Sequence, residues 1–246
     1  MNFSSMLGWW QILNYALSGV IVVQSVIART GFIELTKLIK YTSESQRMRF
    51  ILVSVFKIYF INYGILYVLV PLKIEIPIVS DMLVGVYYDF NTYWYTDIGF
   101  QVITLMVIQA FFPPIEFAYL WFWDVIKRSY NQGRCWRKKV PESTKSKTLL
   151  GYKNLYCGPE FEIHYQYSNM LVITWVTFLF APGIPILFPI ALLGMIILYC
   201  TNRISLAYFN RRPPVYDQKM NQTTLKLLGV APLLYICMGA WVYSNQ

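Results

Sequence analysis

The stretch from Ser168 to Cys200 most constrains the fold, because it contains no charged side chain. Its sequence is SNMLVITWVTFLFAPGIPILFPIALLGMIILYC, and Pro182, Gly183 and Pro185 interrupt it near the middle. One helix that crosses a hydrocarbon core of about 30 Å needs roughly 20 residues. The stretch is too long for one crossing, and its proline-rich corner predicts a helical hairpin that turns back at Pro182 and Gly183.

The composition agrees with a membrane protein. The 246-residue chain is 57% hydrophobic and only 13% charged, whereas about 25% of the residues of soluble domains are charged. Strands are not predicted, because apolar and polar residues do not alternate and the apolar runs are too long for barrel strands. We therefore predict an integral, multi-pass, all-α protein in which residues 1–246 form a single transmembrane domain, in a membrane that the sequence does not specify.

Apolar runs predict where the helices cross. Simple runs lie at roughly 8–28, 50–71, 96–126 and 223–243, each about the length that one span requires. The hairpin lies between the third and the last of these, at 160–208, so that each of its two helices is also about 30 Å long. The predicted architecture is a transmembrane helix bundle of about six spans.

Positive charge predicts the orientation of the bundle. Basic residues are concentrated between the first two spans, in the loop 127–159, and in the segment 203–219. The link between the second and third spans carries Lys73 against three acidic residues. The basic segments are therefore predicted to be cytoplasmic, with both termini outside. Both flanks of the hairpin are basic, so the chain returns to the side it came from; a shallow re-entrant pair is the alternative.

Polar residues inside the predicted spans are candidates for a pathway, because polar side chains in lipid are costly unless they meet partners or water. Glu116 is the first candidate for a permeation residue, with pairing to Lys57 as an alternative role. The competing interpretation is that these residues hold helices together while Lys57 extends to the cytoplasmic surface. The pathway candidates are Gln11, Asn14, Ser18, Lys57, Asn62, Gln101, Thr104, Gln109, Glu116, Gln166 and Asn169.

Two proline-containing positions are predicted hinges. Pro113 and Pro114 remove two backbone donors from the third span and should kink it. Pro182 and Gly183 form the corner of the hairpin.

The loop 127–159 is strongly basic, with aromatic residues between its charges. Ordinary positive-inside charge explains such a loop, and binding of anionic lipid is the functional alternative. The candidates for contact with lipid head groups are Arg134, Arg137, Lys138 and Lys139. Nucleic acid is not predicted as a partner, because the loop is tethered between two membrane helices.

Patterns typical of enzymes are absent from the sequence. It contains no Ser/His/Asp arrangement, no phosphate-binding glycine loop and no metal-ligand spacing. We therefore predict that the chain is not an enzyme, and we predict no cofactor and no metal.

Several stretches resemble the superfamily that joins the anoctamins, the OSCA mechanosensitive channels and the transmembrane channel-like proteins. WVTFLFAPGIPILFPIALL (175–193), followed by RRPP at 211–214, is similar to the late hairpin of an anoctamin. LTKLIKYTSESQRMRFILVSVFKIYFIN (35–62) is similar to the cytoplasmic link and next helix of that family. WYTDIGFQVITLMVI (94–108) and GPEFEIHYQYS (158–168) look closer to large protist membrane proteins of the same broad group.

The resemblance implies that the six spans correspond to the fourth to ninth helices of a ten-helix core, with the pathway between the first four. It implies an ion channel, cation-permeable or mechanosensitive, with phospholipid scrambling or a non-conducting structural subunit as alternatives. The implied partners are membrane lipids, and a second copy or a partner membrane chain.

The chain departs from the family pattern in two ways. Where anoctamins carry acidic pairs for calcium, an approximate alignment places Tyr165 and Ser168, then Leu198 and Asn202. Calcium prefers clustered carboxylate oxygens, so direct calcium gating is not expected. The chain also lacks the early helices, the final helix and a cytoplasmic domain, which suggests a fragment, a split gene product or a reduced relative.

Overall fold

The computed structural model of the chain is an all-α bundle. It describes residues 3–39, 41, 43–71, 73, 87, 89–132, 148–211 and 218–244; within these, the side chains of residues 3–18, 132, 154 and 155 are not described. Five described segments are long and apolar enough to cross a membrane, which suggests a multi-pass membrane protein. They are Gly19–Leu38, Glu44–Leu69, Thr92–Asn131, Leu187–Tyr208 and Lys219–Ser244.

The helices before the hairpin are longer than the apolar runs predict. Helix α1 (Phe3–Leu38) continues well past the expected end at residue 28, so Arg29 lies within it rather than in a cytoplasmic link. The second span consists of α2 (Glu44–Phe60), a π-helical segment η1 (Ile61–Ile65) and α3 (Leu66–Leu69). The third consists of α4 (Thr92–Trp94), a π-helical segment η2 (Tyr95–Gly99) and α5 (Phe100–Gln132).

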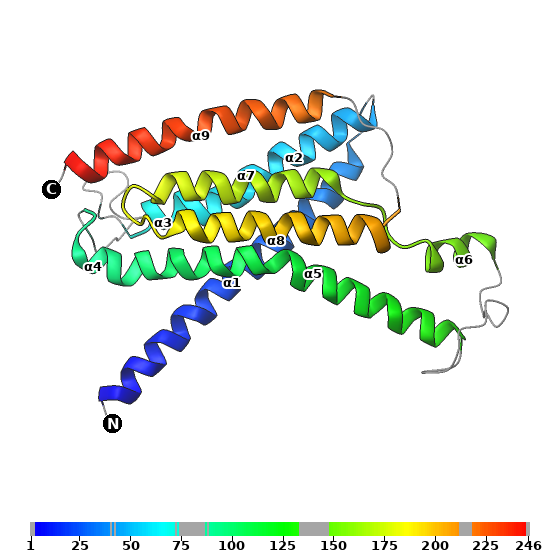
Figure 1. The fold of residues 1–246 in the computed structure, drawn as a ribbon, viewed down its shortest axis with the longest axis horizontal. Helices are drawn as coiled ribbons and strands as arrows, with labels where there is room; N and C mark the ends of the chain where they lie inside the picture. The colour runs from blue at the N-terminus through cyan, green and yellow to red at the C-terminus, as the bar shows by residue number, and fades with distance from the viewer. Residues whose placement is uncertain are drawn as a thin grey trace.

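The predicted hairpin is present. Helix α7 (Ile163–Phe180) and helix α8 (Leu187–Tyr208) lie side by side and are joined at one end of the bundle by a tight turn (Figure 1). Pro182 and Gly183 occupy that turn, where the Gly183 amide donates to the Phe180 carbonyl at 3.1 Å. Tyr243 of the last helix, α9 (Lys219–Ser244), donates its hydroxyl to the Pro182 carbonyl at 3.1 Å.

The two open ends of the hairpin meet, as the charge pattern predicts. The short helix α6 (Leu149–Tyr156) precedes α7, and the chain between them passes the end of α8. There the Arg211 amide donates to the Pro159 carbonyl at 2.9 Å. The end of α5, the start of α7, the end of α8 and the start of α9 all lie at this end of the bundle, opposite the hairpin turn (Figure 1).

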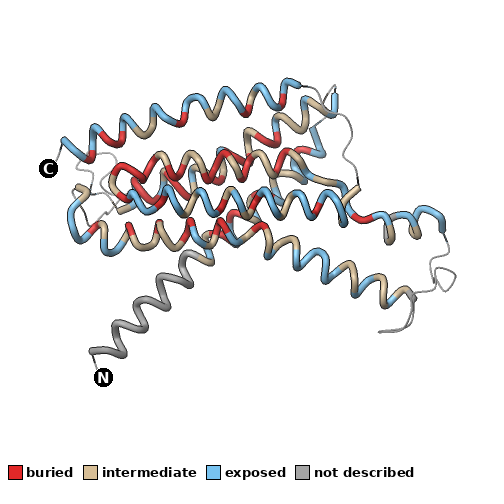
Figure 2. Tube along the Cα trace, viewed as in Figure 1, coloured by how far each residue is buried: buried red, intermediate tan, exposed pale blue. Residues whose placement is uncertain are grey.

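Helix α7 is the centre of the bundle. It packs against α2, α8 and α9, and buried residues run along its length, whereas α8 and α9 expose much of theirs (Figure 2). It corresponds to the fourth predicted span, which is not among the five segments above because its first turns are polar. A polar helix can lie at membrane depth when apolar helices surround it.

Helix α5 bends near its middle (Figure 1), where Pro113 and Pro114 lie within the helix. Each proline lacks the amide that would bond one turn back, so the helix opens on that side. The bend carries the second half of α5 away from the bundle, and α1 crosses α5 near its middle (Figure 1).

Candidate functional site

A cluster of three side chains joins three helices just after the proline bend. Arg29 of α1 donates from Nη2 to Oε1 of Glu116 on α5 at 2.8 Å. Tyr165 of α7 donates its hydroxyl to the other carboxylate oxygen, Oε2, at 2.9 Å. The Arg29 guanidinium also lies 3.9 Å from the centre of the Tyr165 ring. Both oxygens of Glu116 are therefore engaged, and Arg29 is held on two sides.

The cluster is largely shielded from solvent. The side chains of Arg29 and Glu116 are 11% and 22% exposed, and Tyr165 is 5% exposed. A charge in such a place needs a partner, because removal from water costs several kcal/mol. Nη1 of Arg29 is buried without a hydrogen-bond partner, so the cluster leaves one donor unsatisfied.

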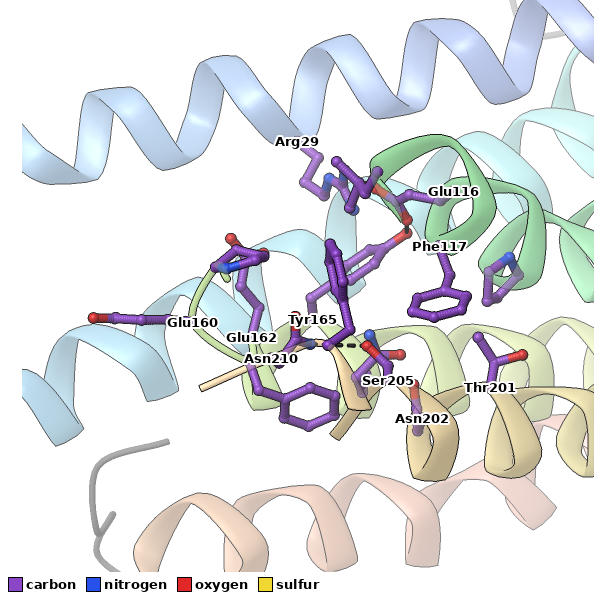
Figure 3. A pocket seen from close by; sticks show the side chains of 16 residues that line it. Arg29, Glu116, Phe117, Glu160, Glu162, Tyr165, Thr201, Asn202, Ser205 and Asn210 are labelled. Atoms are coloured by element: carbon purple, nitrogen blue, oxygen red, sulfur yellow. Dashed lines mark hydrogen bonds and ion pairs between the residues drawn. The ribbon is translucent and has the colours of Figure 1, made fainter. Parts of the chain in front are cut away.

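Glu116 borders a cavity of about 330 Å³ at the end of the bundle where the hairpin opens (Figure 3). Its wall is formed by the bend in α5, the start of α7 and the last turns of α8, with Asn202 and Ser205 among the α8 residues. Asn210 also lines the cavity, and its side-chain amide donates to Ser205 Oγ at 2.8 Å. The cavity is polar on the α7 and α8 side and bordered by Phe117 on the α5 side.

A second hollow of about 450 Å³ lies on the other side of Arg29, between α1 and α2. Arg29, Glu160 and Glu162 border both hollows. Both of these glutamates are exposed to solvent. Acidic side chains therefore lie at the solvent-facing edge of the site, next to the buried Arg29.

Deeper polar contacts continue from this cluster into the bundle. Asn62 in η1 donates to Ser25 at 3.1 Å, one turn before Arg29 on α1. Gln109 on α5 donates to Asn169 on α7 at 3.4 Å, and both residues are buried. Ser168 donates to the Leu52 carbonyl at 3.0 Å.

Apolar packing surrounds these polar contacts. Leu52, Val102, Leu105, Leu171 and Val172 are fully buried where α2, α5 and α7 meet. The cavities described above lie at the hairpin's open end, whereas these five side chains are fully buried in the interior of the bundle.

The predicted pathway residues that the structure describes therefore do not form one continuous site. Glu116 and Gln166 border the cavity, while Gln109 with Asn169, and Asn62, make the deeper contacts. Gln101 and Thr104 are half-buried on α5, where Thr104 bonds the Phe100 carbonyl of its own helix. The side chains of Gln11, Asn14 and Ser18, and the whole of Arg134, Arg137, Lys138 and Lys139, lie outside the described residues.

The alternative role for Glu116, pairing with Lys57, is not what the structure shows, because Arg29 is the partner of Glu116. Lys57 is exposed and borders a different hollow, together with Arg49 and Thr223. The reason is geometric: α1, not the lysine-bearing face of α2, crosses α5 at the bend.

Sequence reasoning did not find Arg29 or Tyr165 as site residues. The sequence pattern could have identified Arg29, because it continues the polar face of the first span four residues after Ser25. No sequence pattern could have identified Tyr165, because one tyrosine among many in a span cannot be distinguished from a tyrosine at the membrane interface.

No family model, curated protein or solved structure matches the chain.

Proposed function

We propose that the chain forms the pathway of an ion channel in the anoctamin/OSCA-like superfamily, cation-permeable or mechanosensitive, within a multi-pass membrane protein. The observation that carries the proposal is the Arg29–Glu116 ion pair. It lies at a polar cavity, inside a bundle whose outer helices expose large apolar side chains. Ionisable residues placed inside a membrane bundle typically mark a route for ions or polar groups.

In this proposal the described arrangement is a closed state. The pair ties α1 to α5, and Tyr165 ties both to α7. The bend at Pro113 and Pro114 is the moving part, since it lies within one turn of Glu116 and its backbone bonds are already interrupted. Opening would part Arg29 from Glu116 and leave the carboxylate facing the cavity, where it attracts cations.

Current recordings from liposomes containing the purified chain test the proposal. We expect Arg29→Gln to raise the open probability at rest, because it removes the tie between α1 and α5. We expect Glu116→Gln to reduce cation selectivity. Lys57→Gln is the control, since Lys57 borders a separate surface hollow, and it should change neither quantity. Unaltered conductance and selectivity in Glu116→Gln and Gln101→Ala would refute the site assignment.

Phospholipid scrambling is a second candidate, favoured by two residues. Gln166 and Asn202 border both the polar cavity and a groove on the side of the bundle between α7 and α8. A dithionite assay on fluorescent lipid in the same liposomes separates scrambling from conduction. Loss of label from both leaflets without current would favour this candidate.

The packed interior also favours a non-conducting structural subunit. In that case the polar contacts hold the helices together, and a second copy or a partner membrane chain completes the assembly. Purification that always recovers a stoichiometric partner, with no ion or lipid flux from the isolated chain, would support it.

A further inference from the structure

The groove between α7 and α8 has the lining of a lipid-binding site. It measures about 600 Å³ and opens on the side of the hairpin. Its deep part is apolar, with Met170 on α7 facing Met195 and Leu198 on α8. Gln166 and Asn202 form a polar part nearer the hairpin's open ends, where Phe161 and Leu206 also line the groove. The lining therefore places polar side chains beside an apolar stretch, as the binding of an amphiphile requires.

Arg203 supplies a positive charge beside Gln166 and Asn202 in the groove. Among the described residues that border the groove it is the charged one, and its side chain is exposed. Nη1 donates to the Tyr199 hydroxyl at 2.9 Å, which orients the guanidinium beside the groove. A guanidinium binds phosphate well because its planar donors match phosphate oxygens.

The polar part of the groove also contains a hydrogen-bond acceptor without a donor. Oε1 of Gln166 is buried without a hydrogen-bond partner, at the boundary between the groove and the polar cavity. A buried amide oxygen without a partner is costly. A head group that carries hydroxyl donors as well as a phosphate would satisfy both Gln166 and Arg203.

The length of the groove limits how much of a lipid it holds. The α8 residues that line the groove run from Met195 to Leu206, which corresponds to about 16 Å at the rise of an α-helix. This is about half of a hydrocarbon core of about 30 Å. The groove is therefore long enough for the glycerol backbone and the first part of the acyl chains of a lipid in one leaflet.

We propose that the α7–α8 groove binds one anionic phospholipid of the leaflet on the basic side of the bundle, with its phosphate at Arg203 and its acyl chains along Met170 and Met195. The proposal uses the membrane placement in the proposed function but does not depend on conduction.

Native mass spectrometry of the purified full chain, titrated with palmitoyl-oleoyl phosphatidylglycerol or the matching phosphatidylcholine, tests the site. The wild-type chain should retain one phosphatidylglycerol, and prefer it over phosphatidylcholine by about fivefold, since one basic residue contributes about 1 kcal/mol. Arg203→Gln should abolish that preference. Lys226→Gln, an exposed cation on α9 that does not border the groove, should keep it.

A second pair of variants tests the apolar part. Met195→Trp fills the groove and should remove the retained lipid, whereas Leu192→Trp places the same ring at an exposed position of α8 outside the groove and should not. Equal retention in Met195→Trp and wild type would overturn the site. Equal loss in both tryptophan variants would overturn it as well, since the lipid would then be part of a general shell around the bundle.

Circular dichroism and size-exclusion chromatography check that each variant folds. If Met195→Trp does not fold, crosslinking of the wild type to a photoreactive phosphatidylglycerol decides: adducts concentrated in 161–170 and 195–206 support the site, and adducts spread over all helices overturn it. A chain that retains the lipid but passes no current would refute the channel proposal alone.

Discussion

At the scale of single residues, Gly158 allows the chain to pass the end of α8. Its φ of +71° lies in the left-handed region, and an added Cβ would approach the Phe209 carbonyl oxygen to 2.2 Å. That oxygen belongs to backbone, so it cannot move aside as the end of a flexible side chain could. The link between α6 and α7 therefore requires glycine at this position.

We expect Gly158→Ala to lower the free energy of unfolding by about 1–3 kcal/mol, the range for a residue forced into a rare backbone conformation. Unfolding in mixed micelles followed by circular dichroism measures it. Gly229→Ala on α9 is the control, because an added Cβ there meets nothing within 4 Å. A similar loss in both variants would show that the effect is not local to the α8 end.

The Arg29–Glu116 pair is the second prediction at this scale. Arg29→Met should destabilise the chain by about 3 kcal/mol, because it leaves a largely buried carboxylate without its cation. Arg29→Met with Glu116→Leu should recover most of that loss, since no charge is then left unpaired. The same unfolding measurement gives the coupling between the two positions.

A double-mutant cycle on the exposed pair Glu34–Lys37 of α1 is the matched control. Its coupling should be at most about 1 kcal/mol, as for surface ion pairs generally. If the Arg29–Glu116 coupling were no larger, the pair would not be the tie between α1 and α5 that the proposed gate requires.

At the scale of elements, α5 and α8 approach each other closely at two small residues. An added Cβ on Gly194 would lie 3.1 Å from the Cβ of Ala110. Small residues at a crossing allow membrane helices to pack backbone to backbone. This contact holds the second arm of the hairpin against the helix that carries the proline bend.

We expect Gly194→Leu to push α5 and α8 apart and to cost about 1–3 kcal/mol, as overpacking of a tight contact does. Thermal unfolding in detergent measures the change. Gly229→Leu makes the same substitution at an open helical position and should cost much less. A tolerated leucine at Gly194 would contradict the close contact.

The hairpin could be predicted from sequence and the lengths of α1 and α5 could not. Pro182 and Gly183 terminate a helix by their own chemistry, so the corner is a local property. Hydropathy instead reports where apolar residues end, and α1 continues as a helix to Leu38 through Arg29 and Lys37. The end of an apolar run marks the edge of the lipid, while the helix ends where a capping or breaking signal appears.

The candidate site was predictable one residue at a time but not as a cluster. A carboxylate beside two prolines in a span is conspicuous in the sequence, which is why Glu116 could be chosen. Its partner depends on which helix crosses α5 at that height, and two cations, Arg29 and Lys57, were compatible with the spacing. Tertiary packing decided between them.

At the scale of the whole molecule, aromatic residues indicate the depth of the bundle in a membrane. The segment Thr92–Asn131 has 40 residues, which at the rise of an α-helix is about 60 Å, roughly twice the hydrocarbon thickness. Exposed Tyr93 lies at one end, and Tyr119, Trp121 and Trp123 are exposed further along. Such residues favour the two membrane surfaces, so we expect the rest of α5 to extend into water beyond them.

This placement predicts the labelling of single cysteines. Cys157, beside the open ends of the hairpin, should react with a membrane-impermeant maleimide only after the cytoplasmic side is opened, in a chain whose other cysteines are replaced by serine. A cysteine introduced by Tyr93→Cys should react from the outside. Labelling of both from the same side would contradict the arrangement of the spans.

The central position of α7 has a consequence for how the protein is made. The arm that begins with His164, Gln166 and Asn169 is shielded by neighbours that come both before and after it in the chain. On its own it would enter lipid poorly, since each such side chain would lose water and find no partner. We therefore expect α7 to enter the membrane stably only after α8 and α9 have been synthesised, so that this half of the chain inserts jointly rather than helix by helix.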